Sequence, residues 1–246
     1  MNACNRSPFV LLHGLTFDRR MWGPVLRALP EDREALALDL PGHGAAPGLG
    51  RPGLSPVVEA VHDAVREAGL ESPVLVGHSI GGPIAAIYAS RYPTSGVVSV
   101  DAPIHLEPFA GWLRSIRAQL EGPGFDELWA AVRGSWRLDL VPAAYRDLLR
   151  AGTRTRAPRE LFLTYQADLL QRPLEHAIRW RDNGLAVLRE KSTPYVSLHA
   201  RRVEPDERGL LRRLLPHAEI VEWPVGHHFP HLADPERFAT LLSRFA

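Results

Sequence analysis

The segment Gly77-His78-Ser79-Ile80-Gly81 lies directly after the apolar run Pro73-Val74-Leu75-Val76 and directly before a stretch of small residues. In a Gly-X-Ser-X-Gly sequence, the two glycines allow a turn from a strand into a helix that is too tight for side chains at their positions. The serine in such a turn has a strained backbone, and its hydroxyl projects from the carboxyl edge of the sheet. The pattern therefore predicts a nucleophile elbow centred on Ser79. The alternative is a glycine-rich turn that contains a serine by chance.

Apolar runs and helical patterns alternate around this motif. Residues 9–12, 35–40, 73–76 and 97–100 are continuous apolar runs, typical of strands that are buried on both faces. Residues 55–69 have apolar positions at helical spacing, and Ser55 is expected to cap that helix. Strands that alternate with helices in this way indicate βαβ units and a parallel sheet.

Polar residues that can carry chemistry follow three of these strands. His13, Ser79 and Asp101 each come directly after or close to the end of an apolar run. Because ligands of parallel sheets bind beyond the carboxyl ends of the strands, we expect these three side chains at one edge of the sheet.

The alternation stops between residues 104 and 190. This segment is rich in aromatic residues and arginine and has no clear strand pattern, so we expect a helical insertion that covers the edge of the sheet. Residues 1–103 and 191–246 would then form the core, with further strands at 195–199 and 219–223 and a final helix capped by Asp234. As a cap, the insertion would supply apolar walls of a substrate pocket. The candidates for these walls, together with one residue of the core, are Phe109, Trp112, Trp136 and Phe229. Their alternative role is to pack the cap onto the core.

Composition narrows the classes of function. The chain has 246 residues, a formal net charge of +1 and one cysteine, Cys4. The charge gives no electrostatic reason to expect binding to nucleic acid or to a membrane surface, and a single cysteine excludes an internal disulfide and a cysteine-based metal site. No apolar stretch approaches the ~20 residues of a membrane span, and no signal-like region precedes the first strand, so we expect a cytoplasmic protein.

Four motifs, in this order along the chain, resemble those of the α/β-hydrolase fold family over nearly the whole sequence. They are His13-Gly14-Leu15, Asp39-Leu40-Pro41-Gly42-His43-Gly44, Gly77-His78-Ser79-Ile80-Gly81-Gly82 and His228-Phe229-Pro230-His231-Leu232. The resemblance implies an α/β fold with a mostly parallel, doubly wound sheet of six strands. The first two strands of the full family fold would be missing, and a helical cap would be inserted.

The resemblance also implies catalytic roles for particular residues. A serine hydroxyl needs a base, and the family places that base in the loop after the last strand, where the motif register favours His228 over His227. The oxyanion of a tetrahedral intermediate would be bound by the backbone N–H groups of Leu15 and Ile80. His13 is expected to brace the loop that carries Leu15.

The third member of a catalytic triad is less clear from the sequence. The family usually places the acid after the strand that corresponds to residues 195–199, but the segment that follows here has arginine or valine at that point. One alternative is Asp101, at the end of the preceding strand, as in a minority of the family. The other is Glu204 or Asp206, reaching in from a shifted loop.

Three functions are compatible with these residues. The leading hypothesis is a serine hydrolase, resembling carboxylesterases, that cleaves an ester, lactone or thioester of a small and largely apolar molecule without a metal or an organic cofactor. The second is a lyase, C–C hydrolase or cyclase of a biosynthetic pathway on the same fold, and the third is a non-catalytic ligand receptor.

The sequence also contains a cluster of arginines, which would form either a contact for an anionic substrate or a solvated face. Its members are Arg150, Arg154, Arg156 and Arg159.

Overall fold

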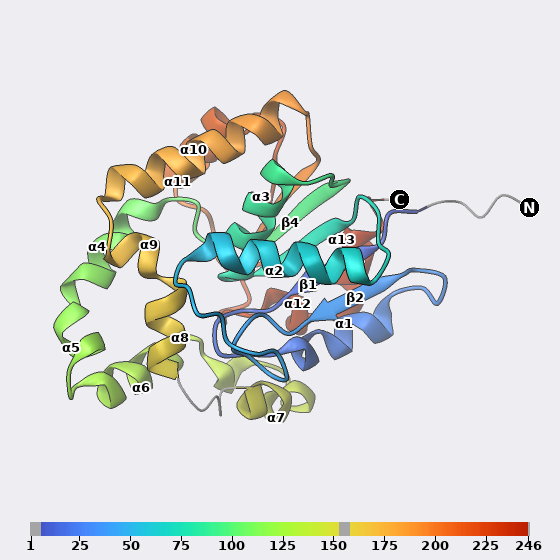
Figure 1. The fold of residues 1–246 in the computed structure, drawn as a ribbon. Coiled ribbons are helices and arrows are strands. Elements are labelled where there is room, and N and C mark those ends of the chain that lie inside the picture. The colour runs from blue at the N-terminus through green and yellow to red at the C-terminus, as the bar shows by residue number, and fades with distance from the viewer. Residues whose placement is uncertain (1–5, 153–157, 246) are drawn as a thin grey trace, which may run out of the picture.

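A sheet of six parallel strands forms the centre of the molecule, with helices on both of its faces (Figure 1). The computed structural model describes residues 6–152 and 158–245. The strand order is β2-β1-β3-β4-β5-β6, and every neighbouring pair is parallel. The strands are β1 Phe9–Leu12, β2 Ala35–Leu38, β3 Val74–His78, β4 Gly96–Val100, β5 Tyr195–His199 and β6 Glu219–Glu222. The predicted fold class is confirmed, and the sheet is parallel throughout.

Helices connect the strands and fill the long interval between β4 and β5. Those of the core are α1 Gly23–Ala28, α2 Leu54–Glu67, α3 Gly81–Arg91, α11 Pro205–Leu214, α12 Pro230–Ala233 and α13 Pro235–Leu242, with the 3-10 helix η1 Arg19–Trp22. Those between β4 and β5 are α4 Leu106–Ser115, α5 Arg117–Glu121, α6 Phe125–Ser135, α7 Ala143–Gly152, α8 Pro158–Tyr165, α9 Ala167–Leu170 and α10 Leu174–Glu190, with the 3-10 helix η2 Leu138–Leu140. We call this second group the helical segment. Helices α4, α5, α6, α8 and α9 extend to one side of the sheet, whereas α7 lies near α1 (Figure 1). Within the described residues, no helix is both long and apolar enough to cross a bilayer.

The alternation of side chains along each strand builds two separate cores. On β1, Val10 and Leu12 belong to the core under α2, α3 and α10, whereas Phe9 and Leu11 belong to the core under α1 and α13. All four side chains are almost completely buried. Each such side chain contributes about 1.5–3 kcal/mol when it is removed from water. Burial on both faces explains why the strands are continuous apolar runs in the sequence.

The helix caps show where the local sequence is sufficient to predict a structural feature and where it is not. Asp234 accepts a hydrogen bond from the N–H of Arg237 at 2.9 Å, so the predicted cap of the last helix is confirmed. The predicted cap Ser55 is wrong, because α2 already begins at Leu54. Instead, Asp168 of the helical segment accepts a hydrogen bond from the N–H of Leu54 at 3.1 Å. A carboxylate distant in sequence thus satisfies one of the N–H groups that are exposed at the start of this helix.

The two glycines of the turn between β3 and α3 are required by the backbone around them. A Cβ at Gly77 would lie 2.0 Å from the carbonyl oxygen of Gly81, and a Cβ at Gly81 would lie 2.5 Å from the carbonyl oxygen of Leu12. In both cases the obstacle is backbone, which cannot rotate away. The helix can therefore start directly above the end of its strand only when both positions lack a side chain.

We predict that Gly77→Ala lowers the free energy of unfolding by about 3 kcal/mol or more, because the added methyl group collides with the backbone. The matched control is Gly209→Ala, in the exposed interior of α11, where an added Cβ has no neighbour within 4 Å. There the same change should raise the free energy of unfolding by about 0.5–1 kcal/mol. Urea denaturation of both variants measures the difference, and a Gly77→Ala protein as stable as the wild type would contradict this account of the turn.

Candidate active site

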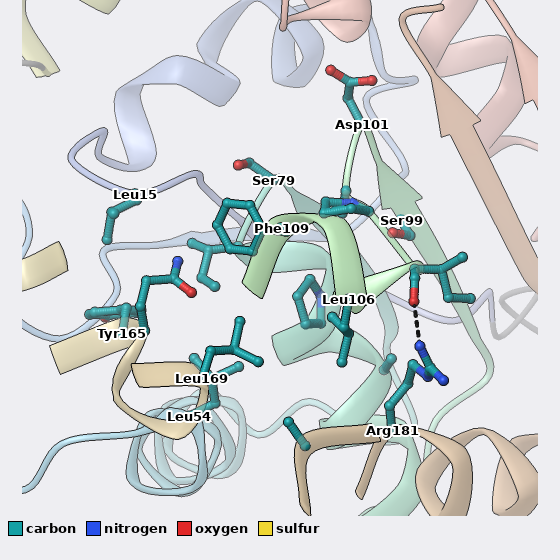
Figure 2. Close-up of a pocket in the computed structure, with 18 of the residues that line it drawn as sticks. Leu15, Leu54, Ser79, Ser99, Asp101, Leu106, Phe109, Tyr165, Leu169 and Arg181 are labelled. Carbon is teal, nitrogen blue, oxygen red and sulfur yellow. Dashed lines mark hydrogen bonds between the residues drawn. The ribbon is translucent and has the colours of Figure 1, made fainter. Parts of the chain in front are cut away.

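A cavity of about 1070 Å³ lies between the carboxyl edge of the sheet and the helical segment. Ser79, Asp101 and His228, which are far apart in the sequence, all line it. Figure 2 shows Ser79 and Asp101 on one side of the cavity, with Leu54, Leu169 and Arg181 on the opposite side. The fold therefore brings the three predicted catalytic residues to one wall.

Ser79 occupies a strained position immediately after β3. Its φ angle is 53°, in the left-handed region that costs a non-glycine residue about 1–3 kcal/mol. The turn is fixed by two backbone hydrogen bonds, from the Ser79 N–H to the Val100 carbonyl at 2.8 Å and from the Gly82 N–H to the Ser79 carbonyl at 2.9 Å. Strain of this kind persists only where the surrounding structure holds it, and it is common at active sites.

Asp101 occupies the equivalent position after the neighbouring strand β4, and its φ angle is 48°. One carboxylate oxygen lies 2.6 Å from Nδ1 of His228, and the other accepts a hydrogen bond from the N–H of Ala200 at 2.9 Å. Burial by itself would raise the pKa of Asp101, but the hydrogen bonds from His228 and Ala200 and the charge of His228 outweigh it and lower the pKa. Asp101 is thus an ionised acceptor that orients the imidazole of His228.

The structure does not bring the alternative acids to His228. The segment after β5 enters helix α11, in which Glu204 is the N-cap residue and Asp206 lies exposed in the first turn. Sequence inspection did not anticipate this helix, although Pro205 is typical of a first turn. Acidic residues at a helix N-terminus have a structural role there, because they interact favourably with the helix dipole.

Two hydrogen bonds hold the loop that carries His228: one within the loop and one to the helical segment. The N–H of His228 donates to the carbonyl of Trp136 at 3.1 Å. The neighbouring His227 also lines the cavity, but its Nδ1 accepts a hydrogen bond from the N–H of Phe229 at 3.2 Å. Burial lowers the pKa of His227. His227 therefore stabilises the loop, and His228 is the imidazole that meets the carboxylate.

Two neutral histidines support the loop that follows β1. Nδ1 of His13 donates to the carbonyl of Gly14 at 2.8 Å, and its Nε2 accepts from the N–H of Leu40 at 2.9 Å. His43 accepts from the N–H of Thr16 at 2.9 Å and lies edge-on to His13. Burial lowers the pKa to about 4 for His13 and to about 3 for His43. The role of His13 follows the prediction, whereas that of His43 was not anticipated from its Pro-Gly-His-Gly motif.

The braced loop presents a backbone donor next to the elbow. Among the described residues, none accepts a hydrogen bond from the N–H of Leu15 or from the N–H of Ile80. Both residues line the cavity with Ser79. These two donors are therefore available to a ligand.

The predicted pocket residues do not all reach the cavity. Phe109, Trp112 and Trp136 line it, as expected for the helical segment. Phe229 does not: it is completely buried in the core on the α1 and α13 side, where it packs against Phe17 with ring centroids 5.2 Å apart. The direction of the Phe229 side chain could not be predicted from the sequence, because it depends on the path of the loop.

The charged side chains in the described wall already have partners. Asp168 accepts the hydrogen bond from the start of α2 that is described above. Arg181 donates to Asp182 at 2.8 Å, and Arg201 forms an ion pair with Glu207. Arg181 also donates to the carbonyl of Ile104 at 3.0 Å (Figure 2). The rest of the wall is mostly apolar.

The two described residues of the predicted arginine cluster lie apart from this wall. Arg150 pairs with Asp147, and Arg159 donates to the carbonyl of Gly122. Neither lines the cavity. Arg154 and Arg156 lie outside the described residues.

Comparison with known proteins identifies the family. Residues 9–241 match the model of the "Alpha/beta hydrolase family". The chain belongs to this family. Among curated proteins of known sequence, the chain is 24% identical to a "Probable serine hydrolase" of Drosophila melanogaster, over 98% of the chain and 81% of that protein. It is 32% identical to "Monoacylglycerol lipase abhd6-A" of Xenopus laevis over 37% of the chain and 28% of that protein. Among solved structures, a thermophilic esterase of Thermogutta terrifontis superposes with a TM-score of 0.70 at 22% identity, over 97% of this chain and 89% of that one, which shows a shared fold.

We predict that acid destabilises this protein through its buried histidines. In the unfolded state His13 and His43 have an ordinary pKa of about 6.5, whereas in the folded state they stay neutral until about pH 4 and pH 3. As the pH falls below 6.5, protons therefore bind the unfolded state first, and the free energy of unfolding falls. Each histidine should account for about 2 kcal/mol of loss between pH 7.5 and pH 5.

The control is His43→Gln, which keeps a side-chain acceptor for the N–H of Thr16 but does not titrate. Urea denaturation of wild type and variant at both pH values gives the loss for each protein. The variant should lose about 2 kcal/mol less than the wild type. Equal losses would show that His43 is not held neutral in the fold.

Proposed function

We propose that the protein is a serine hydrolase that cleaves an ester, lactone or thioester of a small, uncharged and largely apolar molecule through an acyl-enzyme intermediate. The observation that carries this proposal is the hydrogen bond between Asp101 and His228 in the wall of the cavity that also contains Ser79, strained on its elbow. A nucleophile, a base and a group that orients the base are the parts that acyl transfer requires.

In the proposed mechanism, the Ser79 hydroxyl attacks the carbonyl carbon of the substrate while Nε2 of His228 takes its proton. Asp101 holds the Nδ1 proton of His228, which leaves Nε2 as the basic nitrogen, and it stabilises the imidazolium that forms. His228 then returns the proton to the leaving group, and water releases the acyl group by the same route. Ser79 and His228 are not hydrogen-bonded to each other in the structure; catalytic contacts of this kind often tighten only when substrate binds.

The oxyanion would be bound by the N–H groups of Leu15 and Ile80. Both are backbone donors beside Ser79, so the side chains at these positions are free to be apolar and to contact the substrate. Ile80 also precedes α3, whose N-terminus adds a favourable positive potential.

The nature of the cavity supports an uncharged, apolar substrate. We propose that the helical segment acts as a cap, in which Phe109, Trp112 and Trp136 provide aromatic walls. Because Arg181 and Arg201 already pair with carboxylates, an anionic substrate would have to break an existing ion pair. The names of the relatives, a serine hydrolase and a lipase, agree with hydrolysis of an acyl compound.

The proposal is tested by labelling with a fluorophosphonate and by hydrolysis of short-chain p-nitrophenyl esters. The wild type should be labelled stoichiometrically at Ser79 and should turn over the esters, and Ser79→Ala should do neither. Labelling without ester turnover would instead favour a lyase, C–C hydrolase or cyclase. A wild type that is not labelled would contradict the catalytic assignment and favour a ligand receptor.

We predict that Asp101→Asn lowers kcat for p-nitrophenyl esters on the order of 10⁴-fold, because an amide at this position favours the wrong tautomer of His228. The controls are Glu204→Gln and Asp206→Asn, which remove the acids that the structure keeps at the start of α11. Both controls should keep activity close to that of the wild type. Strong loss in a control, with near-normal activity in Asp101→Asn, would reverse the assignment of the acid.

A further inference from the structure

We propose that His78 is a positioning residue for the active site: its imidazole holds the backbone of His228 and thereby sets where the base stands relative to Ser79. This rests on the proposed function, because it assigns His228 as the base. The motif Gly-X-Ser-X-Gly leaves the second position free, so the elbow alone gives no reason for histidine there.

The hydrogen bond from His78 to His228 fixes the protonation of its ring. Nε2 of His78 lies 2.7 Å from the carbonyl oxygen of His228. A carbonyl oxygen only accepts, so Nε2 carries the proton and Nδ1 does not. Among the described residues, Nδ1 has no hydrogen-bond partner. His78 therefore donates its single N–H to the backbone of the loop that carries His228.

Burial keeps the protonation state of His78, and with it this hydrogen bond, unchanged. His78 is completely buried, and its ring lies 4.6 Å from that of His228 and 4.9 Å from that of His231 between centroids. It also stacks on Phe229, at 5.2 Å and 30°. Burial and the neighbouring histidines lower the pKa of His78 well below its usual value. The ring is thus neutral and has one donor under ordinary conditions.

The same ring contacts the other two parts of the site. His78 is the last residue of β3, so its backbone continues directly into the strained turn at Ser79. Nδ1 of His78 also lies only 2.8 Å from where a Cβ would be at Gly14, which precedes the proposed oxyanion donor Leu15. One buried imidazole therefore lies against the elbow, the oxyanion loop and the loop of the base.

The bond from His78 completes the support of His228. The N–H of His228 donates to Trp136, its carbonyl accepts from His78, and its Nδ1 meets Asp101. Without His78 the carbonyl of His228 would lose the hydrogen-bond donor that it has among the described residues, and the loop would be free to rotate to recover one. A displacement of about 1 Å in a catalytic group can lower a rate about 10²-fold.

His78 has no direct path to a substrate. It is not among the described residues that line the cavity, whereas its neighbours Ser79 and Ile80 are. Its effect must therefore appear in the chemical step, with little change in binding. This separates it from a residue that shapes the pocket.

The test compares three variants. His78→Leu removes the donor, and His78→Gln retains an N–H at the same number of bonds from the backbone. His231→Leu is the matched control, because His231 is an equally buried imidazole in the same aromatic cluster, and neither of its nitrogens has a hydrogen-bond partner among the described residues. For p-nitrophenyl ester hydrolysis we expect His78→Leu to lower kcat about 10–100-fold with KM changed less than about threefold. His78→Gln should recover most of that loss, and His231→Leu should keep the wild-type kcat.

A second measurement does not depend on turnover. In proton NMR, the Nδ1 proton of His228 bonded to Asp101 should give a far-downfield signal in the wild type, in His78→Gln and in His231→Leu. This signal should broaden or disappear in His78→Leu. If it is unchanged there, or if His78→Leu has wild-type kcat, the positioning role is overturned. If His231→Leu loses as much kcat as His78→Leu, the loss reflects core packing, and the role is also overturned. An inactive wild type that keeps this pattern of signals would contradict the proposed hydrolase reaction but support the positioning of His228.

Discussion

The close contact of three backbone segments around Gly77 and Gly81 determines the rest of the site. The start of α3 lies so near the ends of β1 and β3 that neither glycine has room for a methyl group. This contact forces Ser79 into its left-handed conformation and turns its side chain out of the sheet. It also brings the loop after β1, with the free N–H of Leu15, beside the N–H of Ile80. One steric constraint thus positions both the proposed nucleophile and the groups that would bind the oxyanion.

The position of Asp101, the proposed acid, depends on the neighbouring strand in a similar way. Because β3 and β4 pair in register at His78 and Val100, Ser79 and Asp101 emerge at the same level of the sheet. Asp101 is also left-handed, and the next strand supports its carboxylate through the N–H of Ala200. An acid after β4 therefore uses the loop after β5 as a hydrogen-bond donor. That loop is then free to continue into α11, which has Glu204 as its N-cap residue and Asp206 in its first turn.

The features that could be predicted from the sequence are those set by short segments. Buried strands, the elbow at Ser79 and the cap at Asp234 each depend on residues that are close together in the chain. Asp101 could be ranked above Glu204, since it directly follows a strand beside the elbow. By contrast, the cap of α2 comes from Asp168, 114 residues away, and the direction of Phe229 depends on how a loop packs. Contacts of this kind are decided by tertiary packing, which leaves no local pattern in the sequence.

The helical segment is tied to the core at points that also serve the site. On one side, the hydroxyl of Tyr165 donates to the carbonyl of Pro41 at 2.8 Å, next to the histidines that support the loop after β1. On the other side, the carbonyl of Trp136 holds the N–H of His228, and the next residue, Arg137, is left-handed with a φ angle of 52°. Trp136 thus lines the cavity, and its backbone carbonyl holds the loop of His228. Tyr165 lines the cavity as well, so the residues that fasten the helical segment to the core are also residues that shape the cavity.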